Sequence, residues 1–228
     1  MRRTIDLSGP LFEGMWSYNS LPNLSGKIPE FTLRQVTSVA SSGAEILHYD
    51  LSSLSGTYIE TAAHMIEGTF LLSDLDPSSF IRQAVVCRIP RKQARELIHR
   101  AELEAHCPHV RGGEALLIDC GWGSQWRSPS FVVDGPSFHA DCLPWLLKQP
   151  MGLLGVDVPC MQAWWAPPGS AESGAGMLLE LFKTGLLLLA PLVNLDRIES
   201  ERGELIALPI NAEGASGAPC RAIFRERA

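Results

Sequence analysis

The sequence predicts an α/β domain built on a mixed sheet. Short apolar runs rich in Val, Ile, Leu, Thr and Tyr recur along the chain, and most are bounded by Gly, Pro, Ser or Asp, which is typical of strands. Segments dense in Ala, Arg, Glu and Leu stand between the later runs, as helices do in an α/β fold. No repeat, low-complexity tract or long linker divides the sequence, so we expect residues 1–228 to form a single domain.

The expected strands differ in character along the chain. Those in the second half, such as Ala115–Asp119, are almost continuously apolar, as strands covered on both faces are. Those near the start follow one another without a helix between them, which indicates antiparallel pairing. We expect strands at residues 3–7, 31–36, 45–50, 56–61, 84–89, 115–119, 152–156, 185–189 and 205–209.

Helices are expected at residues 92–107, 140–148 and 175–183. The first segment opens after Pro90 and is dense in helix-forming residues. The third ends just before Gly185, and glycine is the residue type that most often terminates a helix.

Charge and hydropathy exclude several classes of partner. The 19 Lys and Arg residues against 25 Asp and Glu give a net charge of −6, which argues against binding to nucleic-acid phosphates. The longest apolar stretch, residues 185–193, is broken by Pro191 and is far shorter than the ~20 residues of a membrane helix. The N-terminal sequence has no apolar core typical of a signal peptide. We therefore expect a cytoplasmic protein that acts on a small molecule, without a nucleic-acid or membrane partner.

The most informative stretch is LSGTYIETAAH, from Leu54 to His64. The period of a strand places Tyr58 and Glu60 on one face, and the turn that follows brings His64 near them. A phenol, a carboxylate and an imidazole at one strand end can form a general acid–base cluster, so these are the candidate catalytic residues. The spacing also allows a second interpretation, in which Tyr58 and Glu60 face solvent and His64 is structural.

This stretch resembles the signature H-x-G-T-H-x-D-x-P-x-H of the cyclase family, which includes bacterial kynurenine formamidases and isatin hydrolase. The chain keeps Gly56, Thr57 and His64 and has Glu60 at the Asp position. The resemblance implies the swivelling β/β/α-type domain of that family and a homodimer or homotetramer with sites near subunit contacts. Further segments resemble the family in the same order, namely IDLS (5–8) with GM (14–15), LIDCGW (117–122), GVDVPC (155–160), ALPI (207–210) and GAPCRA (217–222).

The chain departs from the family at the positions that bind metal. Members with the full signature hold one or two divalent ions, usually zinc or manganese, and the metal-bound water attacks an amide or lactone carbonyl. Here the first two His positions hold Leu54 and Tyr58, and the downstream His and Glu positions fall on Leu178 and Ala190. Leu and Ala cannot donate a lone pair, and a catalytic zinc needs about three protein ligands. We therefore expect no cofactor.

The alternative is a single Zn or Mn ion in a rebuilt site. Tyr58, Glu60 and His64 together could supply three ligands, although a neutral phenol is a poor one. A shift of the alignment by two residues would bring Glu180 to the position of Leu178 and would strengthen this alternative.

Five further residues are candidates for substrate binding: Trp16, Gly56, Thr57, Trp122 and Asp157. Trp16 and Trp122 are large apolar side chains in expected loops or strand ends, where pockets are commonly lined. Gly56 allows close approach to the backbone, and Asp157 follows an apolar strand. The alternatives are core packing for the tryptophans and a turn acceptor for Asp157.

Three functions remain open from the sequence. The first is a divergent enzyme that cyclises or dehydrates a small carbonyl-containing substrate, aromatic or polyketide-like, by acid–base chemistry with little or no metal dependence. The second is a metal-dependent hydrolase of an amide, formamide or lactone with a rebuilt metal site. The third is a non-catalytic binding or assembly subunit. Tyr58, Glu60 and His64 stand together in the signature, which favours the first.

Overall fold

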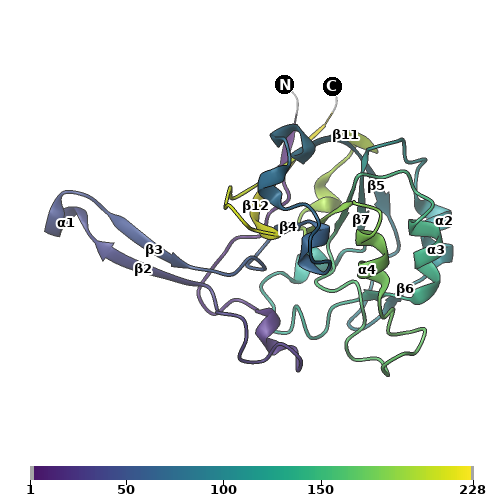
Figure 1. Ribbon diagram of the computed structural model, residues 1–228, viewed down its shortest axis with the longest axis horizontal. Coiled ribbons are helices and arrows are strands. Elements are labelled where there is room, and N and C mark those ends of the chain that lie inside the picture. Colours follow the sequence, from purple (N-terminus) through teal and green to yellow (C-terminus); the bar gives the residue numbers. More distant parts are fainter. Residues whose placement is uncertain (1–2, 227–228) are drawn as a thin grey trace.

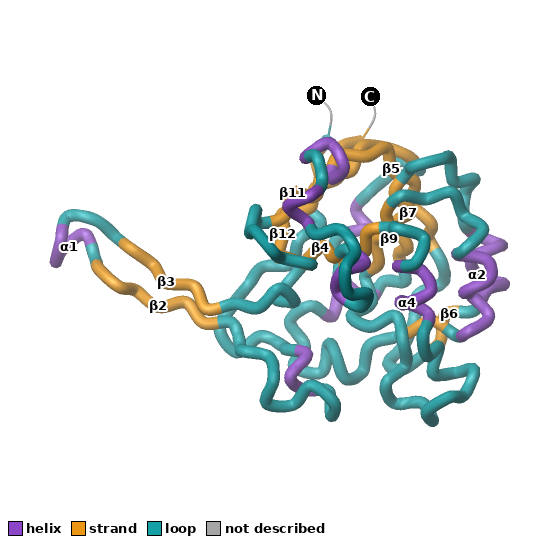
Figure 2. The backbone as a smooth tube through the Cα atoms, in the orientation of Figure 1, coloured by secondary structure: helices purple, strands orange, loops and turns teal. Residues whose placement is uncertain are grey.

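The computed structural model describes residues 3–226 and confirms the predicted mixed α/β fold (Figures 1 and 2). Its main sheet contains β1 (Thr4–Asp6), β4 (Tyr58–Glu60), β5 (Ile81–Arg88), β7 (Ala115–Asp119), β9 (Leu153–Val156), β10 (Leu187–Ala190), β11 (Arg202–Pro209) and β12 (Gly217–Glu226). The strand order is β1-β12-β11-β5-β7-β9-β10-β4, and β12 also pairs with β4. This last pairing closes the strands from β12 to β4 into a barrel-like ring, to which β1 is added along β12.

The ring combines a parallel half with an antiparallel half. Strands β5, β7, β9 and β10 are parallel neighbours, while β4, β11 and β12 join antiparallel. The parallel strands are connected through the short helices α2 (Arg100–His106), α3 (Leu143–Leu146) and α4 (Met177–Phe182), which lie together on one side of the sheet (Figure 1). None of the helices in residues 3–226 is both long and apolar enough to cross a membrane.

The helix expected at residues 92–107 begins only at Arg100, and the structure corrects this boundary. Arg95 has a φ of 56°, a left-handed conformation that interrupts a helix. Residues Leu97–Ile98 instead form β6, which pairs in parallel with β8 (Ser137–Phe138). Glu102 then accepts the backbone N–H of His99 and so caps the first turn of α2.

The other two helices lie where they were expected but are shorter. A 3-10 turn precedes α3, and α4 ends before Gly185, which adopts a left-handed φ of 80°. Short 3-10 turns occupy Tyr18–Ser20, Ala62–His64, Leu72–Asp74, Pro77–Phe80, Trp122–Gln125, Ala140–Cys142 and Leu195–Arg197.

A two-stranded hairpin projects from the body (Figure 1, left). Its strands are β2 (Thr32–Thr37) and β3 (Ile46–Asp50), and the short helix α1 (Val39–Ser42) forms its tip. We refer to residues 32–50 as the arm. Several large apolar side chains of the arm are exposed to solvent, namely Leu33, Val36, Val39, Ile46 and Tyr49.

Two apolar cores lie on opposite faces of the sheet because successive strand residues alternate in direction. Val86 and Leu117 belong to the inner core, which contains residues from every strand of the ring. Val85 and Leu116 belong to the outer core, which packs against the residues of α2, α3 and α4. A cavity beside α4 lies on this outer face.

Candidate functional site

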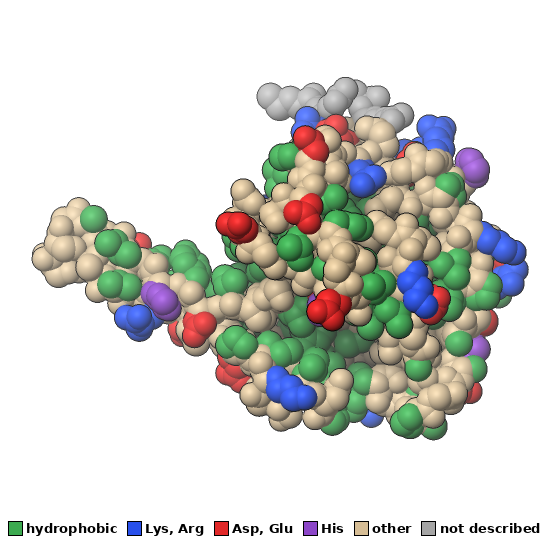
Figure 3. Space-filling view, in the orientation of Figure 1, with side chains coloured by type: hydrophobic (Ala, Val, Ile, Leu, Met, Phe, Trp, Pro, Cys, Tyr) green, Lys and Arg blue, Asp and Glu red, His purple; other side chains and the backbone are tan. Residues whose placement is uncertain are grey.

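A cavity of about 640 Å³ lies beside β4, β9, β10 and α4. Figure 3 shows a hollow lined by hydrophobic side chains beside the root of the arm. Small-molecule pockets commonly have this size and a mainly apolar lining with a few polar groups. The apolar lining includes Leu21, Leu24, Leu54, Met65, Val156, Val158, Met161, Trp164, Leu178, Leu188 and Ala190.

The three candidate catalytic residues Tyr58, Glu60 and His64 all line this cavity. Strand β4 directs Tyr58 and Glu60 toward it, while Ile59 between them packs into the inner core. The hydroxyl of Thr61 accepts the N–H of Ala63 and begins the turn that carries His64. This turn places Nδ1 of His64 3.2 Å from Oε1 of Glu60. The structure therefore brings together the three residues that the spacing predicted to lie close to one another.

Burial sets the charge of the Glu60–His64 pair. The side chain of Glu60 is only 2% exposed, and desolvation raises its pKa to about 8. Desolvation also lowers the pKa of His64, whose side chain is 35% exposed. Both shifts favour the uncharged form, so at neutral pH the pair consists of a carboxylic acid beside a neutral imidazole.

Tyr18 is a further polar residue at the cavity, and sequence reasoning missed it. Its hydroxyl lies 3.0 Å from that of Tyr58 and donates to the carbonyl of Pro159 at 2.7 Å. Because the proton of Tyr18 is directed to Pro159, Tyr58 donates to Tyr18 and keeps its lone pairs for a ligand. Burial and then the neighbouring Glu60 raise the pKa of Tyr58 well above its usual value, which keeps the phenol neutral. Tyr18 and Tyr58 lie 40 positions apart in the sequence, and no motif links them, so the sequence did not indicate this contact.

All six positions that the family resemblance assigns to metal ligands line the same cavity. They are Leu54, Tyr58, Glu60, His64, Leu178 and Ala190. Their convergence supports the alignment on which the loss of ligands was predicted. Glu180, the residue that a shifted alignment would bring in, instead forms an ion pair with Lys183 and does not line the cavity.

The residues of the cavity do not fit the metal centre of the family. Only Tyr58, Glu60 and His64 carry donor atoms at the six positions, and the phenol of Tyr58 is neutral and bonded to Tyr18. Within residues 3–226, the only group of three or more His, Cys, Asp or Glu side chains whose ligand atoms lie within 4.8 Å of one another is elsewhere. A catalytic zinc needs about three protein ligands, and the six positions supply only one carboxylate, Glu60, and one imidazole, His64.

The two tryptophans expected to bind substrate lie in the outer core and do not line the cavity. The Trp16 ring stacks on Phe131 with centroids 4.8 Å apart. Trp122 is buried, and its indole N–H donates to the carbonyl of Phe131 at 3.0 Å. Both therefore have the packing role that was the alternative interpretation.

The other three predicted binding residues support the loops around the site. Gly56 has a left-handed φ of 69°, and a Cβ there would lie 2.6 Å from the side chain of Leu11, so the close approach is to protein. Thr57 donates to the carbonyl of Pro191 at 2.7 Å. Asp157 is buried and accepts backbone N–H groups from the loop after β7, at 3.1 Å from Cys120. The structure brings none of these three residues to the cavity.

Comparison with known proteins identifies the family. The family model described as "Putative cyclase" matches residues 5–163. A kynurenine formamidase from Bacillus thuringiensis (strain Al Hakam) is 31% identical over 222 residues, which span 97% of this chain and 96% of that protein. The related enzyme of Bacillus cereus (strain ZK / E33L) has the same identity and coverage.

Solved structures share the fold at lower identity. Isatin hydrolase A from Ralstonia solanacearum superposes with a TM-score of 0.83 and 20% identity, covering 99% of this chain and 92% of that one. A potential metal-dependent hydrolase with cyclase activity gives a TM-score of 0.74 and 16% identity, with full coverage of both chains.

The chain belongs to the cyclase family, as the signature predicted. These relatives are named as hydrolases, which agrees with the expectation of an enzyme and supports a hydrolase-like function more than a cyclisation. Two solved neighbours are described as potential or predicted metal-dependent hydrolases, so they lend no support to the expectation that no cofactor is needed.

Proposed function

We propose that this chain acts on a small, mainly apolar carbonyl compound by acid–base catalysis, with little or no dependence on a catalytic metal ion. The observation that carries the proposal is the Glu60–His64 pair in an apolar cavity where the family places its metal ligands. Active sites commonly hold titratable groups whose pKa values are shifted by burial, and such groups often serve as the acid and the base.

The pair can supply both an acid and a base. In the arrangement that uses both, the imidazole proton is on Nδ1 of His64, which lies 3.2 Å from Oε1 of Glu60, and the carboxyl proton is on Oε2. Nε2 of His64 is then unprotonated and can remove a proton from water or substrate. Oε2 of Glu60 can give its proton to a carbonyl or leaving-group oxygen. The hydroxyl oxygen of Tyr58 can accept a hydrogen bond from a substrate N–H or O–H.

Hydrolysis of an amide, formamide or lactone is the first reaction to test because the similar proteins are named as hydrolases of this kind. In that reaction His64 would activate the water. Cyclisation or dehydration of an aromatic or polyketide-like precursor is the second candidate. It is favoured by the apolar cavity without a water-activating ligand set, because a substrate that attacks itself needs no activated water.

The experiment that tests the proposal is a turnover assay on chelator-treated protein of known metal content. Isatin, an aryl formamide and an aryl lactone are the first substrates, assayed with and without added Zn²⁺ or Mn²⁺. We expect turnover that survives the chelator. Turnover that appears only with added metal would support the metal-dependent alternative, and ligand binding without turnover would support a non-catalytic subunit.

The oligomeric state and the cellular location of the chain form a second part of the proposal. We propose a homodimer or homotetramer that uses the arm as a contact, because its exposed side chains include Val36 (50% exposed) and Val39 (68% exposed). A two-stranded hairpin without a core of its own is also only marginally stable in water. We also propose a cytoplasmic location and a small-molecule substrate, and we expect no nucleic-acid or membrane partner.

A further inference from the structure

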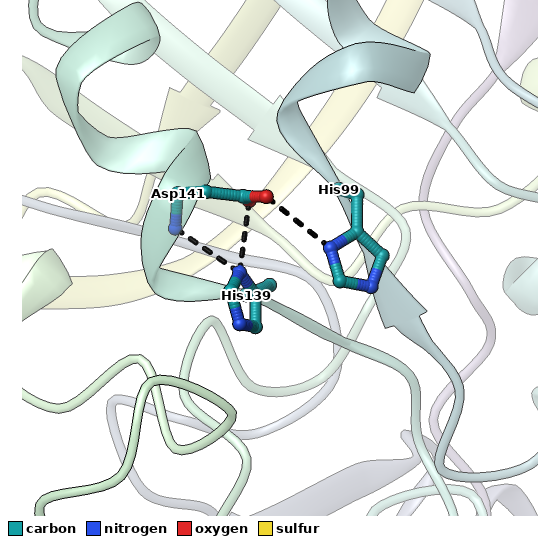
Figure 4. A group of neighbouring side chains, drawn as sticks. All are labelled: His99, His139 and Asp141. Atoms are coloured by element: carbon teal, nitrogen blue, oxygen red, sulfur yellow. Dashed lines mark hydrogen bonds and ion pairs between the residues drawn. The ribbon is translucent and has the colours of Figure 1, made fainter.

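A second group of chemically active side chains lies outside the cavity. His99, His139 and Asp141 each offer one ligand atom, and these atoms all lie within 4.8 Å of one another. Figure 4 shows the two imidazoles facing the carboxylate from separate elements. No part of the proposed acid–base chemistry uses this group, which we call the outer triad.

The strand pair β6–β8 places the two histidines side by side. Leu97 pairs with Ser137 and Ile98 with Phe138, so His99 and His139 follow at equivalent positions of two parallel strands. The N–H of His139 donates to the carbonyl of Ile98 at 2.9 Å and continues this pairing. The two rings consequently lie with centroids 4.6 Å apart.

Asp141 joins the two rings through its carboxylate. Its Oδ2 lies 3.3 Å from Nδ1 of His99, and its Oδ1 lies 3.1 Å from Nδ1 of His139. Ligands of a tetrahedral zinc at ~2.0–2.2 Å from the metal lie roughly 3.4 Å apart, close to these separations. The N–H of Arg100 also donates to Oδ1 at 3.1 Å, which fixes the carboxylate at the start of α2.

The chemistry of the triad favours a metal over two separate ion pairs. One carboxylate can neutralise only one imidazolium, and two charged rings at this spacing would repel each other. A divalent ion instead uses a lone pair of each neutral ring together with the carboxylate. The partial exposure of Asp141 (41%) and His99 (48%) leaves room for water in the remaining coordination positions. Two imidazoles and a carboxylate are a ligand set that suits Zn²⁺ and similar ions and does not suit Mg²⁺ or Ca²⁺.

We propose that His99, His139 and Asp141 bind one divalent transition-metal ion, such as Zn²⁺, at a site separate from the cavity. Coordination through Nδ1 of His139 would replace its contact with the N–H of Asp141, which is long at 3.3 Å.

The site is connected to the wall of the cavity. The N–H of Phe138 donates to the carbonyl of Met161 at 3.0 Å, and the N–H of Ala140 donates to the carbonyl of Ala171 at 2.9 Å. Met161 and nearby Ser173 line the cavity. A metal at the outer triad would therefore hold the segment of residues 161–173 more firmly and stabilise the folded chain.

Calorimetric titration of the chelator-treated full chain with ZnCl₂ tests the proposal, with MgCl₂ as the comparison ion. We expect about one zinc per chain and no magnesium binding. The variants His99→Ala and Asp141→Asn should each weaken zinc binding at least about tenfold, while thermal unfolding without metal confirms that they fold. Zinc should also raise the melting temperature of the wild-type chain and have a smaller effect on that of the two variants.

Two control variants separate this site from others. His106→Ala removes an exposed histidine of α2 outside the triad, and His64→Ala removes the histidine of the cavity. Both should retain zinc binding. Absence of saturable binding, or equal loss in His106→Ala, would overturn the proposal. Loss in His64→Ala with retention in His99→Ala would overturn it too, and would place the metal in the cavity.

Discussion

Nδ1 of His64 lies 3.2 Å from Oε1 of Glu60, and no group within residues 3–226 donates a hydrogen bond to that buried oxygen in good geometry. A buried carboxyl oxygen without a donor costs free energy unless the group holds a proton or gains a partner. A proton on the buried carboxyl group of Glu60 lowers this cost, and the raised pKa of Glu60 agrees with it.

Replacing either member of the pair should abolish most turnover. We expect His64→Ala and Glu60→Gln each to lower kcat by at least ~10²-fold, the contribution of a positioned general acid or base. Steady-state kinetics on any substrate that the assay finds measures this effect. Glu67→Gln, at an exposed glutamate near the pair, is the matched control and should leave kcat unchanged. Wild-type turnover in His64→Ala would rule out the proposed base.

The pH dependence of turnover should be bell-shaped. Activity should fall as the pH rises through about 8, because Glu60 loses the proton that it donates. It should also fall at acidic pH, below the ordinary histidine value of 6.5, because His64 becomes protonated only below its lowered pKa. The two apparent pKa values belong to the coupled pair, so Glu60→Gln should shift the acidic limb and remove the alkaline one. A profile that is flat from pH 5 to 9 would contradict this scheme.

The free energy of unfolding should depend on pH because of the carboxyl proton of Glu60. The pKa of Glu60 is raised on folding from 4.5 to about 8, so the folded state binds the proton more tightly than the unfolded state does. Its contribution to stability is therefore largest below pH 4.5 and falls as the pH rises toward 8. Glu60→Gln lacks this loss, so its free energy of unfolding relative to wild type should increase between pH 5 and 8, by up to a few kcal/mol. Urea unfolding at both pH values measures it, and a difference independent of pH would show that Glu60 is ionised in the fold.

Restoring ligands should restore a metal site in the cavity. The double substitution Tyr58→His and Ala190→Glu would add two potential ligands to Glu60 and His64. The cavity would then hold four, since all four positions line it. We expect one additional zinc or manganese ion per chain relative to wild type after dialysis, measured by elemental analysis. Ala190→Glu alone is the control, because it leaves three potential ligands plus a neutral phenol. No additional metal in a folded double variant would mean that these positions do not converge as the structure places them.

The arm should control the oligomeric state. Val36→Lys and Val39→Lys place charges on exposed apolar positions of the arm and should dissociate a homodimer or homotetramer without unfolding the body. Light scattering coupled to size-exclusion chromatography measures the mass. Leu208→Lys, at an exposed apolar position on β11 away from the arm, is the control. A wild-type chain that is monomeric, or an oligomer unaffected by both arm variants, would exclude this contact.

Local patterns predicted most of the strands because strands covered on both faces appear in a sequence as short, almost continuous apolar runs. Ala115–Asp119 forms β7 with the expected boundaries. The helix expected from residue 92 failed for a reason that no local pattern contains. Lys92 is buried and forms an ion pair with Glu102, and Leu97–Ile98 pairs as a strand with Ser137–Phe138, a segment far along the chain.

The sequence by itself determined the family and the candidate residues Tyr58, Glu60 and His64, because these depend on residue type and spacing along one strand and turn. Tertiary structure alone decided the rest. It placed Trp16 and Trp122 in the core, brought Tyr18 to Tyr58, and joined the outer triad through the pairing of two short strands. Contacts between segments far apart in the chain depend on how the sheet closes, and no periodicity along the sequence encodes that closure.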